Sequence, residues 1–110
     1  MSRRVKLLDL HGYDVLTAVD LTLTTVREAF ENGYAEVDVR HGARDVVDPV
    51  EPGEGRGGIK WELRRMIRGG HFDTWTDTVD VMEGGVRFLI RNNPRQRREH
   101  WSPLPRRTRG

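Results

Sequence analysis

The sequence predicts an α/β fold, more closely an α+β two-layer sandwich in which two helices lie on a four-stranded mixed sheet. Three observations lead to this prediction. Apolar residues recur with the two-residue period of a strand in four short segments. They recur with the three-and-four spacing of a buried helix face in two other segments. Glycine, proline and asparagine separate the segments, whose order is β-α-β-α-β-β.

The first three elements form a βαβ unit. Val5–Leu10 alternate as a strand, and Asp14 is a suitable N-cap for a helix that ends near Asn32. Leu16 is expected to broaden the buried face of this helix. Tyr34–His41 alternate as the second strand. Because a right-handed crossover makes the two strands parallel, their carboxyl ends should lie at the same edge of the sheet.

The second half of the chain supplies a shorter helix and a hairpin. Residues 43–57 form an acidic insertion rich in Gly and Pro, longer than ordinary connections. The next helix is predicted at Ile59–Arg68. Phe72–Val81 and Val86–Ile90 then read as strands. The short turn between them, with two glycines, favours antiparallel pairing.

Charge divides the chain into two regions. Up to Ile90 it holds 12 Lys and Arg against 16 Asp and Glu, and from Arg91 onward it holds 7 Arg against one Glu. We therefore expect residues 1–91 to form one domain and residues 92–110 to form a flexible, arginine-rich tail. Such a tail is an electrostatic arm for phosphates or, alternatively, a solubilising end without a dedicated partner.

Composition excludes several classes of site. The chain has no cysteine, so disulfides, thiolate metal sites and a cysteine nucleophile are absent. No apolar run approaches the about 20 residues of a membrane span. The segment Met1–Arg4 lacks the apolar stretch of a signal peptide. These features lead us to expect a soluble, cytoplasmic protein without membrane partners.

The tetrapeptide Asp9-Leu10-His11-Gly12 closes the first strand pattern. Side chains alternate along a strand, so Asp9 and His11 share one face. In open α/β sheets this edge is where ligands bind, and an acid beside an imidazole is suited to proton transfer near neutral pH. The second strand ends in His41-Gly42, which should lie nearby. The structural alternative is that Asp9 bonds backbone amides of the next turn and that His11 bonds a loop carbonyl.

These elements, taken in order, resemble the Smr (small MutS-related) domain: Leu-Asp-Leu-His-Gly, a long helix, a strand ending in His-Gly, a glycine-rich approach to a second helix, and a hairpin with Gly-Gly. The resemblance covers about Val5–Ile90. It implies a fold like the C-terminal domain of translation initiation factor three and nuclease activity on RNA or DNA. It also implies that Asp9 and His11, which match the family's Asp-Leu-His motif, are catalytic.

The second motif of that family, His-Gly-x-Gly, departs from its usual form here. The chain reads His41-Gly42-Ala43-Arg44, then the acidic insertion, and glycines return at Gly55-Arg56-Gly57-Gly58. We interpret this as a motif split by the insertion. The split form still places glycines before a helix N-terminus, whose amides favour phosphate.

The predicted site contains three catalytic candidates, Asp9, His11 and His41. The candidates for holding phosphate or nucleic acid are Gly12, Gly42, Arg44, Arg56, Gly57, Gly58, Lys60, Arg95, Arg97, Arg98, Arg106 and Arg107. For Lys60 the alternative is a solvated helix face. Trp61 and Trp75 are base-stacking or, more commonly, core residues.

The leading hypothesis is an endonuclease that prefers RNA. His11 would deprotonate a ribose 2′-hydroxyl or a water, with Asp9 orienting it and stabilising its cation. His41, Arg56 and the amides near Gly57 and Gly58 would stabilise the phosphate. A mechanism without a metal ion is favoured, because the histidines lack the close spacing of metal ligands; Mg²⁺ is the alternative.

Three other functions remain open at this point. A DNA-nicking nuclease would use the same residues. A non-catalytic RNA-, DNA- or ribosome-binding module would keep the fold and bind through the basic tail. A protein-interaction adaptor would use the acidic insertion to bind a basic partner.

Overall fold

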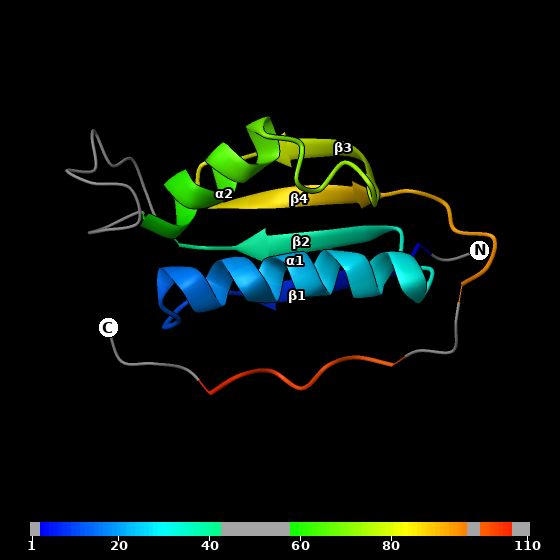
Figure 1. The fold of residues 1–110 in the computed structure, drawn as a ribbon, viewed down its shortest axis with the longest axis horizontal. Coiled ribbons are helices and arrows are strands. Elements are labelled where there is room, and N and C mark those ends of the chain that lie inside the picture. The colour runs from blue at the N-terminus through cyan, green and yellow to red at the C-terminus, as the bar shows by residue number, and fades with distance from the viewer. Residues whose placement is uncertain (1–2, 43–57, 97–99, 107–110) are drawn as a thin grey trace.

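A computed structural model describes residues 3–42, 58–96 and 100–106 of the chain. Within them the order of elements is the predicted β-α-β-α-β-β (Figure 1). The elements are β1 (Val5–Asp9), α1 (Val15–Glu31), β2 (Glu36–Arg40), α2 (Gly58–Arg68), β3 (Thr76–Val81) and β4 (Gly85–Ile90). The prediction of an α+β fold with a four-stranded mixed sheet and two helices is confirmed.

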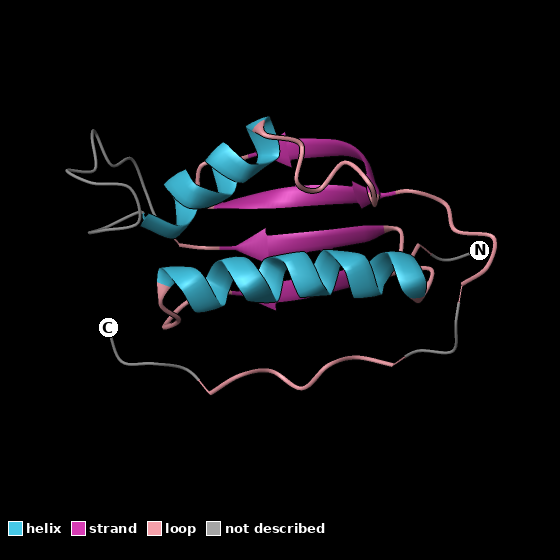
Figure 2. Cartoon of the chain, in the orientation of Figure 1, coloured by secondary structure: helices cyan, strands magenta, loops and turns pink. Residues whose placement is uncertain are grey.

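The sheet has the strand order β1-β2-β4-β3. β1 and β2 pair in parallel, from Val5 opposite Glu36 to Asp9 opposite Arg40. β4 pairs antiparallel with β2 on one side and with β3 on the other, as the hairpin prediction requires. Both helices lie on one face of the sheet (Figure 2). The carboxyl ends of β1 and β2 therefore meet at the edge where α1 and α2 begin.

The ends of α1 follow from its sequence. Asp14 is the N-cap, and its Oδ1 accepts a hydrogen bond from the Thr17 amide at 2.7 Å. The hydrogen bonds from Thr17 lower the pKa of Asp14 below its ordinary value. After Asn32, Gly33 adopts a φ of +74°, which stops the helix. The prediction that Leu16 broadens the buried face is wrong, because Leu16 lies on the solvent side and is 84% exposed.

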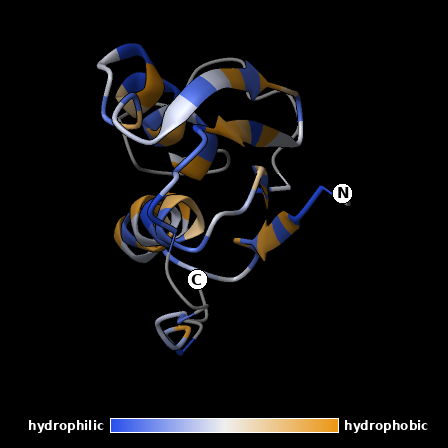
Figure 3. Ribbon diagram, turned by 90° about the vertical axis from the view of Figure 1, so that its right-hand side faces the viewer, coloured by the Kyte–Doolittle hydropathy of each residue, from blue (hydrophilic) through white to orange (hydrophobic). Residues whose placement is uncertain are grey.

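The core lies between the sheet and the helices. Figure 3 shows apolar and hydrophilic residues alternating along the strands, so that one face of the sheet is apolar. The largest fully buried side chains are Phe72, Phe88, Leu10, Leu63, Val26, Val37, Val39 and Val86. The opposite face carries no helix in Figure 2, and Leu7 on it is 69% exposed. Within the described part of the chain, α1 and α2 are each too short or too polar to span a bilayer.

β3 begins at Thr76, later than the predicted Phe72. Residues 69–75 form successive turns, with the Trp75 amide bonding to the Phe72 carbonyl at 3.1 Å. Phe72 is buried and packs on Phe88 with ring centroids 4.7 Å apart. The apolar residues of this segment therefore pack in the core from turns, and their pattern alone resembled a strand. Trp75 packs against the core, in agreement with the interpretation of it as a core residue.

Residues 100–106 run back along α1 toward the carboxyl end of β1 (Figure 1). Trp101 packs against the core, and Ser102 hydrogen-bonds to Glu28 of α1. Residues 100–106 are therefore packed on α1 and β1, because Trp101 and the polar groups beside it find partners there.

Candidate functional site

The carboxyl ends of β1 and β2 are held together at one edge of the sheet. The Leu10 amide donates to the Arg40 carbonyl at 2.8 Å, which extends the parallel pairing past β1. Gly42 adopts a φ of +74°, and a Cβ built on it would lie 4.0 Å from Nδ1 of His11. The predicted meeting of the two strand ends therefore occurs, with the His11 imidazole beside Gly42.

Asp9 organises the turn that follows β1. Its Oδ1 accepts a hydrogen bond from the His11 backbone amide at 2.9 Å. This bond is the structural alternative that the sequence offered for Asp9, and it fixes the backbone from which the imidazole projects. Asp9 and His11 are both exposed at the surface, and Gly12 follows with a φ of +89°. The pair is thus accessible to a ligand from solvent.

His41 occupies a different environment. Its residue is only 7% exposed. Burial, and secondarily the cations of Lys60 and Arg64, lower the pKa of His41 to about 4. The imidazole is therefore neutral at pH 7, and it suits hydrogen bonding better than holding a charge. The backbone amides of His41 and Gly42 donate to the Gly84 carbonyl at 3.1 and 3.2 Å, so the β3–β4 turn secures the end of β2.

The first turn of α2 supplies positive charge beside the end of β2. Gly58 and Lys60 are buried, and Lys60 is 4% exposed. The alternative of a solvated helix face is wrong for Lys60. Its charge acts on His41, as does that of Arg64 one turn later. A helix N-terminus with cations beside it attracts anions, so this part of the site is chemically suited to a phosphate.

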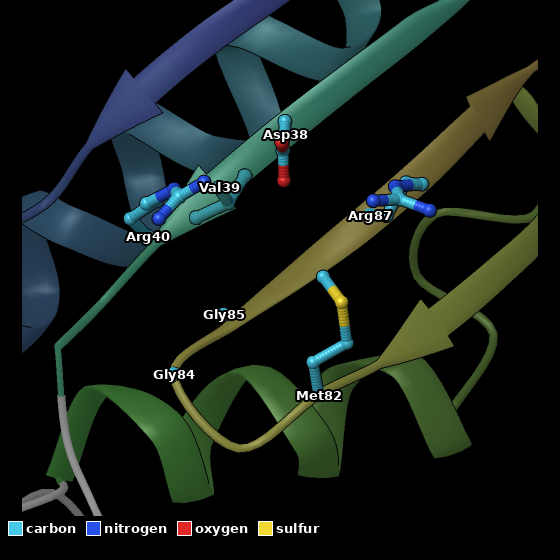
Figure 4. A pocket seen from close by; sticks show the side chains of 7 residues that line it. All are labelled: Asp38, Val39, Arg40, Met82, Gly84, Gly85 and Arg87. Carbon is cyan, nitrogen blue, oxygen red and sulfur yellow. The ribbon is translucent and has the colours of Figure 1, made fainter.

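A pocket of about 190 Å³ lies beside the site between β2 and β4. Figure 4 shows Asp38, Met82 and Arg87 around it, with α1 and α2 behind the strands. The pocket therefore opens on the sheet face that the helices leave uncovered. Arg40, the cross-strand partner of Asp9, is also part of its lining. We did not predict this pocket, although the alternation that places Asp38 and Arg40 with Asp9 on one face was a usable signal.

The tail arginines that the structure describes lie at two places. Arg95 follows β4 at the end of the sheet opposite to the site. Arg106 follows Pro105, whose carbonyl accepts a hydrogen bond from the Tyr13 hydroxyl at 3.1 Å. Tyr13 belongs to the loop after β1, so Arg106 lies next to the site and Arg95 does not. The remaining candidates, Arg44, Arg56, Gly57, Arg97, Arg98 and Arg107, lie outside the described residues.

Metal ligands do not gather in the described part of the chain. Among residues 3–42, 58–96 and 100–106, no group of three or more His, Asp or Glu is placed to hold a metal ion. The accessible groups at the site are instead the carboxylate of Asp9 and the imidazole of His11, whereas His41 is buried. This donor set is suited to proton transfer and to anion binding.

Comparison of the chain with protein-family models, with curated proteins and with solved structures found no match. The resemblance to the Smr domain therefore depends on the motifs quoted above and on their order.

Proposed function

We propose that the protein is an endonuclease that cleaves RNA by acid–base chemistry. The observation that supports this most directly is the exposed Asp9–His11 pair at the carboxyl end of β1, beside Gly42. Glycine at position 42 leaves space next to Nδ1 of His11, and a phosphodiester can approach the backbone closely there. RNA is the preferred substrate because its 2′-hydroxyl is an internal nucleophile.

In the proposed reaction His11 removes the proton of the ribose 2′-hydroxyl. The 2′-oxygen forms a bond to the adjacent phosphorus, and the bond from phosphorus to the 5′-oxygen breaks. The leaving 5′-oxygen takes up a proton from the histidine cation or from water, which leaves a cyclic phosphate. Asp9 holds the turn that carries His11, and its negative charge stabilises the imidazolium that forms.

The phosphate of the substrate is held by groups on the α2 side of the site. Lys60 and the first turn of α2 supply positive potential. His41 is neutral, so in this proposal it contributes packing and a hydrogen bond instead of charge. Gly12 and Gly42, both with positive φ and without a side chain, leave room for the phosphate to approach the backbone.

The test is cleavage of labelled single-stranded RNA, duplex DNA and nicked DNA, each with and without Mg²⁺. We expect RNA to be cut, and His11→Ala to reduce the rate by about 100-fold or more, because positioned proton transfer contributes about 10²–10⁴-fold. His71→Ala is the matched control, since His71 is also exposed but follows the C-terminal end of α2, whose N-terminal end lies at the site. Equal rates for wild type and His11→Ala would refute the assignment.

Asp9→Asn separates the two roles of Asp9. The amide oxygen can still accept the hydrogen bond from the His11 backbone, so the turn and the stability should be kept. The lost charge should lower the cleavage rate by roughly tenfold, as expected for a hydrogen bond or contact with a charged group. If wild type binds RNA and cuts none of the substrates, the protein is a binding module instead of a nuclease.

A further inference from the structure

Residues 100–106, which we call the C-terminal strap, run antiparallel to α1 and are anchored at several points. The first anchor is a reciprocal pair at the end of α1. The His100 amide donates to Oδ1 of Asn32 at 3.1 Å, and Nδ2 of Asn32 donates to the His100 carbonyl at 3.4 Å. Asn32 is buried, so this anchor is sheltered from water.

The second anchor is Ser102 on a buried carboxylate of α1. The Ser102 amide lies 3.1 and 3.0 Å from the two carboxylate oxygens of Glu28, and the Ser102 hydroxyl donates to the same carboxylate. Glu28 is 6% exposed. A buried carboxylate without hydrogen-bond donors is costly, so the strap and α1 satisfy each other here.

The third anchor is Trp101, which contacts Lys6 of β1 and Tyr34 of the loop between α1 and β2. Its ring packs edge-on against Tyr34 with centroids 5.2 Å apart. Nζ of Lys6 in β1 lies 4.5 Å from the centre of the Trp101 ring, a cation–π distance. Pro103 and Pro105 restrict the following backbone to extended conformations, which reduces the entropy lost when the strap docks.

The far end of the strap is attached to the candidate site. The Tyr13 hydroxyl donates to the Pro105 carbonyl at 3.1 Å, and Tyr13 is 8% exposed. Tyr13 follows His11 and Gly12 in the loop after β1. The strap therefore holds the exposed residue Arg106 next to the loop that carries His11.

We propose that the strap makes Arg106 a fixed contact for a backbone phosphate of an RNA strand bound at His11. The inference rests on the proposed function for its ligand, RNA, but not on cleavage. An arginine held in place loses less freedom on binding than one on a free tail, and its guanidinium matches a phosphate geometrically. Trp101 and Ser102 act as positioning residues, because they reach the RNA only through Arg106.

The test measures affinity for a labelled single-stranded RNA at several salt concentrations, in the full chain with His11→Ala to prevent cleavage. Arg106→Ala should weaken binding by about fivefold, the loss expected for one or two hydrogen bonds. It should also reduce the slope of log affinity against log salt by about 0.7, the value for one phosphate contact on a single strand. Arg95→Ala, an exposed arginine at the other end of the sheet, is the matched control.

Ser102→Pro undocks the strap without changing Arg106, because it removes both the amide and the hydroxyl that bond Glu28. Undocking is measured by the NMR shift of the Trp101 indole. If Ser102→Pro leaves that shift unchanged, Trp101→Ala, which removes the ring that packs on Tyr34, serves as the undocked background instead. In the undocked background Arg106→Ala should have no further effect, although alone it weakens binding.

Three results would overturn this inference. Equal losses from Arg106→Ala in the docked and undocked backgrounds would mean that the tail acts as a free arm. An unchanged salt slope with a lowered melting temperature would mean that the strap is structural only. Tighter binding after undocking would mean that the strap covers the RNA surface. None of these results depends on the cleavage assay, so the strap can fail while the nuclease proposal stands, and the reverse.

Discussion

The ends of β1 and β2 carry the same two residues, His-Gly, in opposite environments. His11 is exposed, whereas His41 is 7% exposed and neutral at pH 7. Both following glycines have positive φ. The local sequence therefore directs the chain in a similar way at both strand ends, and the surroundings of the imidazoles differ for another reason.

That reason is the register of the two strands. Asp9 lies opposite Arg40, so continuing the parallel register places Leu10 beside His41 and His11 beside Gly42. Leu10 is fully buried, and His41 shares its side of the sheet, where α2 covers it. One residue of offset thus separates an imidazole that can exchange protons with a ligand from one that is part of the protein interior.

The largest effect that distinguishes the two histidines is on stability at acidic pH. The pKa of His41 is about 4 in the folded protein and 6.5 as its ordinary value, so the unfolded chain binds its proton more readily. The contribution of neutral His41 to the free energy of unfolding is fully present above pH 6.5 and is lost as the pH falls from 6.5 to 4. The loss is up to about 3 kcal/mol.

Urea unfolding between pH 4 and pH 7 measures this difference. His41→Gln should flatten the acid side of the profile, because Gln does not titrate. His11→Gln, the same change at the exposed histidine, is the matched control. Parallel profiles for wild type and His41→Gln would show that the burial of His41 is not coupled to its protonation.

The fold could be predicted largely because its signals are local. The cap at Asp14 and the stop at Gly33 follow from turn chemistry, and the strands β1, β2 and β4 follow from alternation. The start of β3 could not be predicted in this way. Phe72 is buried from a turn, and a period-two pattern does not distinguish a turn that packs in the core from a strand.

The site was predictable only as far as neighbouring strands determine it. The meeting of His11 and Gly42 follows from a parallel βαβ unit. The burial of His41 and Lys60 depends on where α2 crosses the sheet, and the docking of Trp101 depends on α1 and β1 together. Such contacts join segments that are distant in the sequence, and the hydrophobic period of a single segment does not predict them.

An intermediate effect is expected at the turn that secures β2. A Cβ on Gly85 would lie 2.1 Å from the Val39 carbonyl oxygen, a backbone atom that cannot move alone. Gly85→Ala should therefore lower the free energy of unfolding by about 2 kcal/mol, within the range for overpacking. Gly84→Ala is the control, because a Cβ there meets nothing within 4 Å.

Gly85→Ala and Gly84→Ala also test whether a structural change at the end of β2 is transmitted to the end of β1. In Gly85→Ala the amide signals of His41 and Gly42 should shift in NMR spectra, since both bond to the adjacent Gly84 carbonyl. The signals of the loop 9–13 should shift less. Equal shifts in both places would mean that the ends of β1 and β2 respond as one unit.

The smallest expected effect concerns Gly42, which touches both strand ends. Its φ of +74° costs a non-glycine residue about 1 kcal/mol, so Gly42→Ala should reduce stability by that amount. The new methyl group would lie 4.0 Å from Nδ1 of His11, an ordinary contact that leaves the imidazole in place. A lower rate of RNA cleavage by folded Gly42→Ala must then come from a substrate that can no longer approach the backbone.

Gly33→Ala is the control that isolates this loss. Gly33 has the same φ of +74° but lies at the other end of the sheet, where the added methyl must displace the exposed Gln96 side chain. Gly33→Ala should therefore be at least as destabilised in urea as Gly42→Ala, while only Gly42→Ala reduces the rate of RNA cleavage. Because the two glycines have the same φ, the backbone strain is matched. An equal cleavage rate in both variants would therefore show that the phosphate does not bind beside Gly42.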